Sequence, residues 1–282
     1  MAILSELPSD VVLELFTHFP LKTLIAARGV SRTWRTFVEE SDINPIRRAL
    51  LHFYLRIVHS PWFLVSRKWV AENNRSFDRE DYMRTLRQYG PGCHIPEDFA
   101  MWILEWPARA VIRCQWPGLP DTLCRVPCNP LTRCIGYNCL GTLPPTVRVV
   151  TYSEYVNDED ENDDEQLFID VPALAIWEEP RDVKIWLLLD GSDRFRGQIL
   201  STSADFNEFE GDKYHTNQFY NYKKNWLDYL EYQIGQADCV YEIHADYVER
   251  PASFYEPGPL ALDFDSERIV GREWSKISDT EG

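Results

Sequence analysis

The sequence predicts an α+β protein: a small N-terminal module of three helices, a helical segment, and a mainly antiparallel sheet domain with a C-terminal helix. Three observations predict this class. The first fifty residues hold three short segments with apolar residues at helical spacing. After Trp116, segments rich in β-branched and aromatic residues alternate with turn signals such as Asp190-Gly191. A long helical pattern, NWLDYLEYQI, follows them.

The first helix is predicted within LPSDVVLELFTHFP, from Leu7 to Pro20. At 100° per residue its large apolar side chains cover an arc of about 140°; they are Val11, Val12, Leu15, Phe16 and Phe19. Ser9 or Asp10 is expected to cap its start, and Pro20 to end it.

Two more short helices complete the module. LKTLIAAR is expected to end at Gly29, since glycine favours the left-handed position after a helix. Ser31 is expected to cap a third helix that carries Trp34, Phe37 and Val38 on one face. Three helices of this length make a very small core. Their apolar faces therefore need a partner, either the rest of this chain or another protein.

The remaining chain is divided by its patterning. A helix is expected over 46–58, and further helices in DREDYMRTLRQY and PEDFAMWILEWPARAVI. The stretch PGLPDTLCRVPCNPLTRCIGYNCLGTLPP is expected to be irregular, with strands in 147–155, LFIDVPALAIW, VKIWLLLDG and RFRGQIL, and a helix in FYNYKKNWLDYLEYQI. The predicted parts are 4–44, a helical segment 45–116, an α+β domain 117–262 and a charged tail 263–282 that is expected to fray.

Charge and composition exclude several classes of function. Lys and Arg number 29 against 45 Asp and Glu, a formal charge of −16, which argues against nucleic acid and anionic membrane surfaces as partners. No apolar run approaches the roughly 20 residues of a spanning helix. Seven cysteines, with no secretory leader before them, favour reduced thiols in the cytoplasm and/or nucleus.

Few residues indicate chemistry. The spacing Cys124-x3-Cys128-x5-Cys134-x4-Cys139 makes these four cysteines the metal candidates, but the loop between the pairs is short for structural zinc, and free thiols are favoured. The histidines lack metalloprotease spacing, and nucleotide-binding glycine motifs are absent. No catalytic residue and no cofactor is expected, so the chain is predicted not to be an enzyme.

Two further features bear on partners. Residues 158–165, DEDENDDE, are interpreted as a solvated loop between strands, with a calcium site or a docking patch for a basic partner as alternatives. The ten tryptophans and fourteen tyrosines favour protein-binding surfaces. Most of the tryptophans in patterned elements are nevertheless expected in the core: Trp102, Trp106, Trp116, Trp177, Trp186 and Trp226.

The first forty residues resemble an F-box, the module that binds the adaptor of SCF-type ubiquitin ligases. The opening Leu7-Pro8, the spaced apolar helices ending at Val30, and Trp34 after Ser31-Arg32 carry the resemblance. It implies a non-catalytic substrate receptor that binds the SCF adaptor, through it cullin, and an unknown protein substrate. The adaptor contacts it implies are Leu7, Pro8, Val12, Leu15, Phe16, Leu24, Val30 and Trp34.

Two looser resemblances concern the rest of the chain. DINPIRRALL and the tryptophan-rich stretch after it resemble a group of fungal F-box proteins. The order IPEDFAMWILEW, LLLDGSDRFRGQIL and NWLDYLEYQI resembles SUKH-type α+β domains, which bind other proteins. The alternative function is accordingly a SUKH-like interaction or scaffold protein that acts outside ubiquitination.

Overall fold

The computed structural model describes residues 7–90, 92–126, 134–156, 165–179, 183–192, 194–202, 213–216 and 220–244. The chain forms two compact units: Met1–His52 with Glu249–Gly282, and Phe53–Val248. The four-part division proposed from the sequence stays a prediction.

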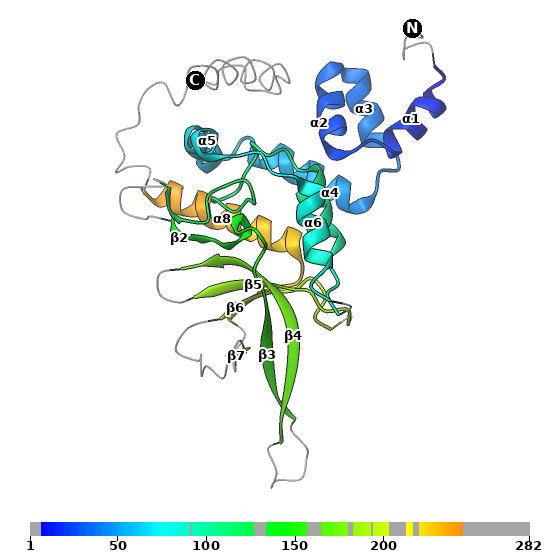
Figure 1. Cartoon of the computed structure of the whole chain (residues 1–282). Coiled ribbons are helices and arrows are strands. Elements are labelled where there is room, and N and C mark those ends of the chain that lie inside the picture. The colour runs from blue at the N-terminus through cyan, green and yellow to red at the C-terminus, as the bar shows by residue number, and fades with distance from the viewer. Residues whose placement is uncertain are drawn as a thin grey trace. The chain divides into compact units, whose positions relative to one another are not determined.

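Eight α-helices lie in the described residues (Figure 1). They are α1 (Ser9–Thr17), α2 (Leu21–Val30), α3 (Arg32–Glu40), α4 (Pro45–Ile57), α5 (Pro61–Asn73), α6 (Arg79–Arg87), α7 (Glu97–Glu105) and α8 (Trp226–His244). Helix α5 is not among the predicted helices, although its start carries two recognisable signals. The Ser60 side chain accepts a hydrogen bond from the amide of Phe63, and Pro61 occupies the first helical turn.

Two of the predicted helix ends are wrong. Pro8, not Ser9 or Asp10, precedes α1, and its carbonyl accepts the first helical hydrogen bond from Val12 (3.1 Å). Helix α2 continues through Gly29 to Val30. It ends because Ser31 takes an extended conformation, in which its hydroxyl accepts a hydrogen bond from the amide of Trp34 (3.1 Å) and caps α3. The predicted cap at Ser31 is confirmed.

The described strands form one mainly antiparallel sheet. They are β1 (Leu123–Val126), β2 (Cys134–Asn138), β3 (Val147–Val156), β4 (Glu165–Glu178), β5 (Lys184–Leu188), β6 (Ile199–Thr202), β7 (Lys213–Thr216) and β8 (Tyr220–Lys223). Their order is β1-β2-β4-β5-β6-β8; β3 also pairs with β4, and β7 pairs with β3 in parallel. The α+β class is therefore confirmed.

Two predictions within the sheet domain are wrong. The stretch expected to be irregular contains two antiparallel strands, β1 and β2, of four and five residues; Gly136 lies within β2 and does not end it. The helix expected from Phe219 begins only at Trp226, after β8. The side-chain oxygen Oδ1 of Asn225 accepts a hydrogen bond from the backbone amide of Asp228 (2.8 Å), and this cap fixes the later start of the helix.

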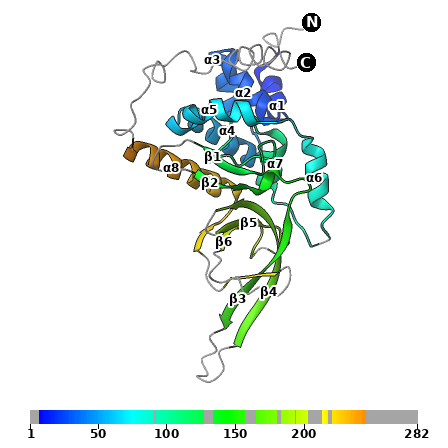
Figure 2. The same ribbon diagram turned by 60° about the vertical axis from the view of Figure 1, so that its left-hand side comes forward.

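The longest strand, β4, organises the sheet. One edge of β4 pairs first with β3, from Val156↔Glu165 to Val147↔Leu174, and then with β2, at Asn138↔Trp177. Its other edge pairs with β5. Figures 1 and 2 show β3 and β4 running together as a long twisted hairpin away from helices α5 to α8.

The core of the larger unit is aromatic, and the six tryptophans predicted to be buried are buried. The ring centroids of Trp102 lie 4.8 Å from Trp116 and 4.9 Å from Trp226. Asp98 on α7 joins helix to helix, because its carboxylate accepts a hydrogen bond from the amide of Trp226 at the start of α8 (2.9 Å). Within the described residues, no helix is long and apolar enough to cross a lipid bilayer.

Candidate functional site

Helix α1 carries two apolar stripes, one turned into the module and one turned out. Val12 and Phe16, four residues apart, are 3% and 0% exposed. Val11 and Leu15, also four residues apart, are 42% and 37% exposed. Residues at this spacing share a helix face. The 140° apolar arc therefore combines a core stripe with an outward stripe, and the outward stripe is free to meet a partner.

The eight predicted contact residues also divide into buried and exposed ones. Val12, Phe16 and Leu24 are buried and hold the helices together. Pro8, Leu15 and Val30 are exposed, with Val30 at 62%, while Leu7 and Trp34 are half-buried. The structure thus makes the exposed residues the available contacts and the buried ones their support. That these residues bind an adaptor stays a prediction.

Val11 is an exposed apolar residue that the predicted contacts omit. On the wheel it lies at one end of the apolar arc, next to Leu15, and this position is the signal that could have identified it. Val11, Leu15 and Val30 are the exposed large apolar side chains found in the described part of the smaller unit. Val11 and Leu15 lie on one face of α1 and Val30 at the end of α2, and we call these three residues together the outward patch.

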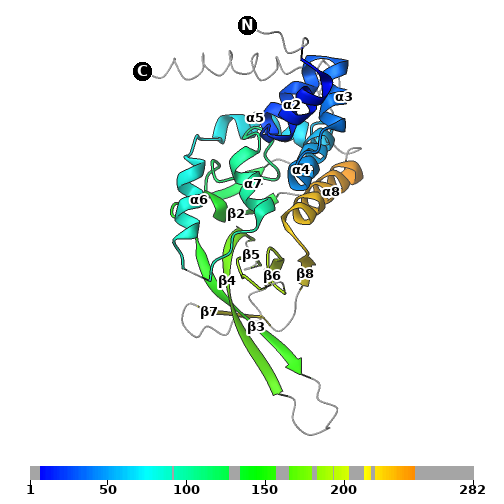
Figure 3. The same ribbon diagram turned by 90° about the vertical axis from the view of Figure 1, so that its right-hand side faces the viewer.

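Aromatic packing beneath the outward patch fixes the three helices. The Phe16 ring of α1 meets the Trp34 ring of α3 edge-on, with centroids 5.5 Å apart, and also contacts Phe37 (6.3 Å). Such pairs contribute about 0.5–1.5 kcal/mol beyond area burial. Trp34 on α3 therefore helps to hold α1 in place by packing against Phe16. Figure 3 shows α1, α2 and α3 close together.

Polar contacts brace the far side of α3. Arg28 on α2 forms an ion pair with Glu39 on α3 (2.9 Å), and the Arg28 side chain is 15% exposed. The Arg48 guanidinium on α4 donates to the carbonyl oxygens of Glu39 (3.2 Å) and Ser41. These bonds satisfy carbonyls at the end of α3 that have no helical partner. The C-terminal end of α3 is consequently tied to both α2 and α4.

The cysteine cluster is described only in part. Cys128 lies outside the described residues. In the pairing of β1 with β2, Cys124 lies opposite Gly136 and Cys134 lies opposite Val126, so the two cysteines are not partners. Burial raises the pKa of the Cys139 thiol to about 12. In the described part of the chain, no three His, Cys, Asp or Glu residues converge as metal ligands.

Most of the acidic run 158–165 also lies outside the described residues. The register of the hairpin places it between the ends of β3 and β4, because Val156 pairs with Glu165. Neither the docking patch nor the calcium alternative is tested by the structure.

Comparison with known proteins gives one finding. The F-box domain profile matches residues 4–45, which include α1, α2 and α3. No curated protein and no solved structure matches the chain. The likenesses to fungal F-box proteins and to SUKH-type domains therefore gain no support. F-box proteins are generally non-catalytic adaptor subunits, and F-box domains typically bind the adaptors of SCF complexes. The three helices with their outward patch, together with this match, identify residues 4–45 as an F-box domain.

Proposed function

We propose that the chain is a substrate-receptor subunit of an SCF-type cullin-RING ubiquitin ligase. The observation that carries this proposal is the F-box domain at 4–45 with exposed apolar side chains on its first two helices. In this reading the F-box binds the SCF adaptor, and through it cullin, while the larger unit binds a target protein.

The proposed role needs no catalytic residue of this chain. Holding the target on one unit and the adaptor on the other raises the effective concentration of the target near the ubiquitin-carrying enzyme. The acidic chain, with a charge of −16, repels nucleic acid and anionic membranes. We further propose that the protein acts in the cytoplasm and/or nucleus, where the adaptor and reduced cysteines are found together.

The outward patch supplies the means of adaptor binding. Exposed large apolar side chains are ordinary when scattered, but Val11 and Leu15 stand on one face of one helix. The partner surface is therefore expected to be apolar and to bury these side chains together, with Trp34 and Phe16 holding α1 in position from beneath.

Binding of the full chain to purified SCF adaptor, measured by calorimetry, tests the proposal. A complex that also retains cullin supports the receptor role. Adaptor binding that never extends to cullin favours the alternative, an interaction protein acting outside ubiquitination. Absence of adaptor binding by a folded chain refutes the receptor role.

A further inference from the structure

The larger unit has a pocket at an irregular point of the sheet. Between Asn138, which pairs with Trp177, and Val147, which pairs with Leu174, β4 advances three positions while the opposite edge advances nine. The extra residues form a loop, Cys139–Thr146, that leaves the sheet edge. On the other edge of β4 the register with β5 shifts between Ala175 and Trp177. The pairing of β4 is thus irregular on both of its edges near Ala175.

The loop is held in one shape by named contacts. The Asn138 amide donates to the carbonyl oxygens of Trp116 (2.8 Å) and Leu119 (3.1 Å). Leu140 is fully buried, and the Thr142 hydroxyl donates to the Cys139 carbonyl (2.8 Å). The loop rejoins β4 where the Ala175 amide donates to the Thr146 carbonyl (3.0 Å). The pocket wall is therefore preformed.

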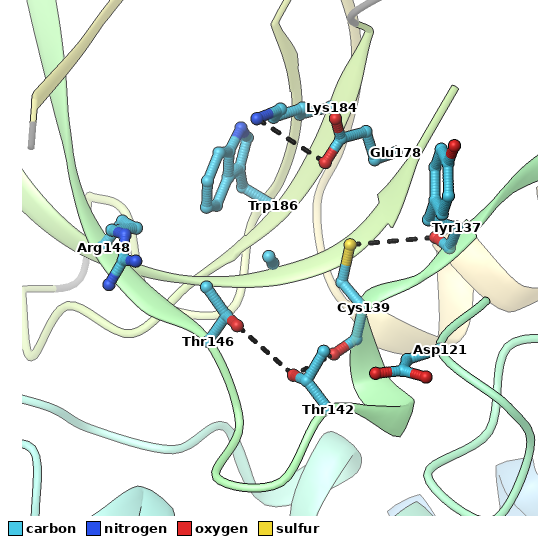
Figure 4. A pocket seen from close by; sticks show the side chains of 10 residues that line it. Asp121, Tyr137, Cys139, Thr142, Thr146, Arg148, Glu178, Lys184 and Trp186 are labelled. Carbon is cyan, nitrogen blue, oxygen red and sulfur yellow. Dashed lines mark hydrogen bonds and ion pairs between the residues drawn. The ribbon is translucent and has the colours of Figure 1, made fainter. Parts of the chain in front are cut away.

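The pocket has a volume of about 330 Å³, within the range of small-ligand sites. Ala175 and the buried ring of Trp186 form its apolar part, and the remaining lining is polar (Figure 4). The Lys184 ammonium and the Glu178 carboxylate lie 3.5 Å apart in it and neutralise one another. Cys139 adds a protonated thiol, which excludes a thiolate nucleophile at neutral pH.

Two charged side chains at the pocket differ from this pair. Figure 4 shows Arg148 and Asp121 on opposite sides of the pocket. Within the described residues, the Arg148 guanidinium makes one hydrogen bond, to the Val147 carbonyl (3.3 Å). The Asp121 carboxylate makes no hydrogen bond or ion pair to any described residue. The pocket therefore offers one cation at one side and one anion at the other.

Exposed apolar side chains adjoin the pocket. Tyr137, which lines it, is 42% exposed, and Leu143, within the loop, is 68% exposed. A ligand confined to the pocket would leave Leu143 uncovered, whereas an extended chain crossing the pocket would cover both side chains. Apolar surface beside placed polar groups is typical of macromolecular recognition.

We propose that this pocket binds a short peptide segment of another protein, with an acidic side chain at Arg148, a basic one at Asp121 and a small apolar one over Ala175 and Trp186. This deepens the proposed function, because such a segment would be the part of the target that the receptor reads. The inference rests on the proposed function only where it assigns the peptide to the target of the ligase.

Selection of phage-displayed random 12-residue peptides on the immobilised full chain tests the pocket. Enriched peptides are expected to carry one acidic and one basic residue at a fixed spacing. Arg148→Glu weakens a representative peptide about tenfold or more and reselects a basic residue at the acidic position; Asp121→Lys has the converse effect at the other position. Lys224→Glu and Glu72→Lys, exposed charge reversals outside the pocket lining, leave affinity within about twofold.

Two results overturn the inference: no peptide is enriched, or enriched peptides bind both pocket variants as tightly as the unmodified chain. Peptides that bind the outward patch would give the second result, because the two pocket variants leave that patch unchanged. Adaptor affinity, measured on the same variants, separates the two proposals. If peptide binding fails while the adaptor still binds, the pocket assignment falls and the receptor role stands; the opposite pattern removes the receptor role alone.

Discussion

Truncation of the outward patch to alanine should weaken adaptor binding without unfolding the F-box. Alanine is the best helix former, so Val11→Ala, Leu15→Ala and Val30→Ala leave α1 and α2 intact. Each truncates a side chain that is only partly buried, with an exposed fraction between 37% and 62%. The loss therefore measures contact with the partner.

The magnitude follows from exposure. At about 0.8 kcal/mol per buried CH₂, weighted by exposed fractions of 42%, 37% and 62%, the three truncations remove about 2.5 kcal/mol of binding. Since 1.4 kcal/mol is tenfold, the Kd of the adaptor complex should rise about 60-fold. Calorimetric titration of the full chain with adaptor measures this directly.

Two controls make the result decisive. Leu143→Ala with Val149→Ala removes comparably exposed apolar surface from the larger unit and should leave adaptor affinity unchanged. Phe16→Ala instead empties the core beneath Trp34, costs about 3–5 kcal/mol of stability and should lower helical circular dichroism as well as binding. A folded triple variant that binds within about threefold of the unmodified chain would refute the reasoning.

Four further substitutions probe the larger unit. The Arg79 guanidinium donates hydrogen bonds to three carbonyls at the end of α7, those of Ile103 (2.9 Å), Leu104 (3.0 Å) and Trp106 (2.8 Å). Arg79→Met should therefore lower the stability by about 2–4 kcal/mol, measured by urea titration. An unchanged urea midpoint would contradict this. Burial raises the pKa of Asp98 above its ordinary 3.8, so the native state binds this proton more tightly than the unfolded state does. The stability of the unmodified chain relative to Asp98→Asn should therefore fall as the pH rises from about 3.8 through the raised pKa. A stability difference that does not change with pH would contradict the raised pKa. A Cβ at Gly136 would lie 2.4 Å from the Trp177 ring, so Gly136→Val should lower the stability by about 1–3 kcal/mol. Gly235 in α8 has open space around it, so Gly235→Ala should raise the stability by up to about 1 kcal/mol. Equal urea midpoints for the two variants would contradict the packing.

Local signals explain why the F-box could be predicted. Ser31 was identifiable as a cap from its type and position, and the apolar spacing located α1 and α2 to within a few residues. Gly29 was misassigned because a competing local preference, the cap at Ser31, carried the helix one residue further. Val11 was overlooked because a wheel shows which residues are apolar, not which part of a wide arc faces inward.

The pocket could not be predicted in the same way. It arises where the partner of β4 changes from β3 to β2, and strand pairing between distant segments leaves no periodic mark in the sequence. Arg148 lies in β3 and Asp121 in the segment before β1, and only the tertiary fold brings both to one site. Cys139 was noticed for its spacing to other cysteines, but its surroundings, which keep it protonated, come from residues far along the chain.

The extra residues at 139–146 also bear on how this protein could diversify. Because the loop leaves and rejoins the same edge of β4 at Trp177 and Leu174, its length can change without shifting any strand by one residue and exchanging the two sheet faces. Loop insertions of this kind are tolerated at small entropic cost. The segment is therefore a natural graft point, where related or engineered chains could alter what they recognise while the scaffold beneath stays constant.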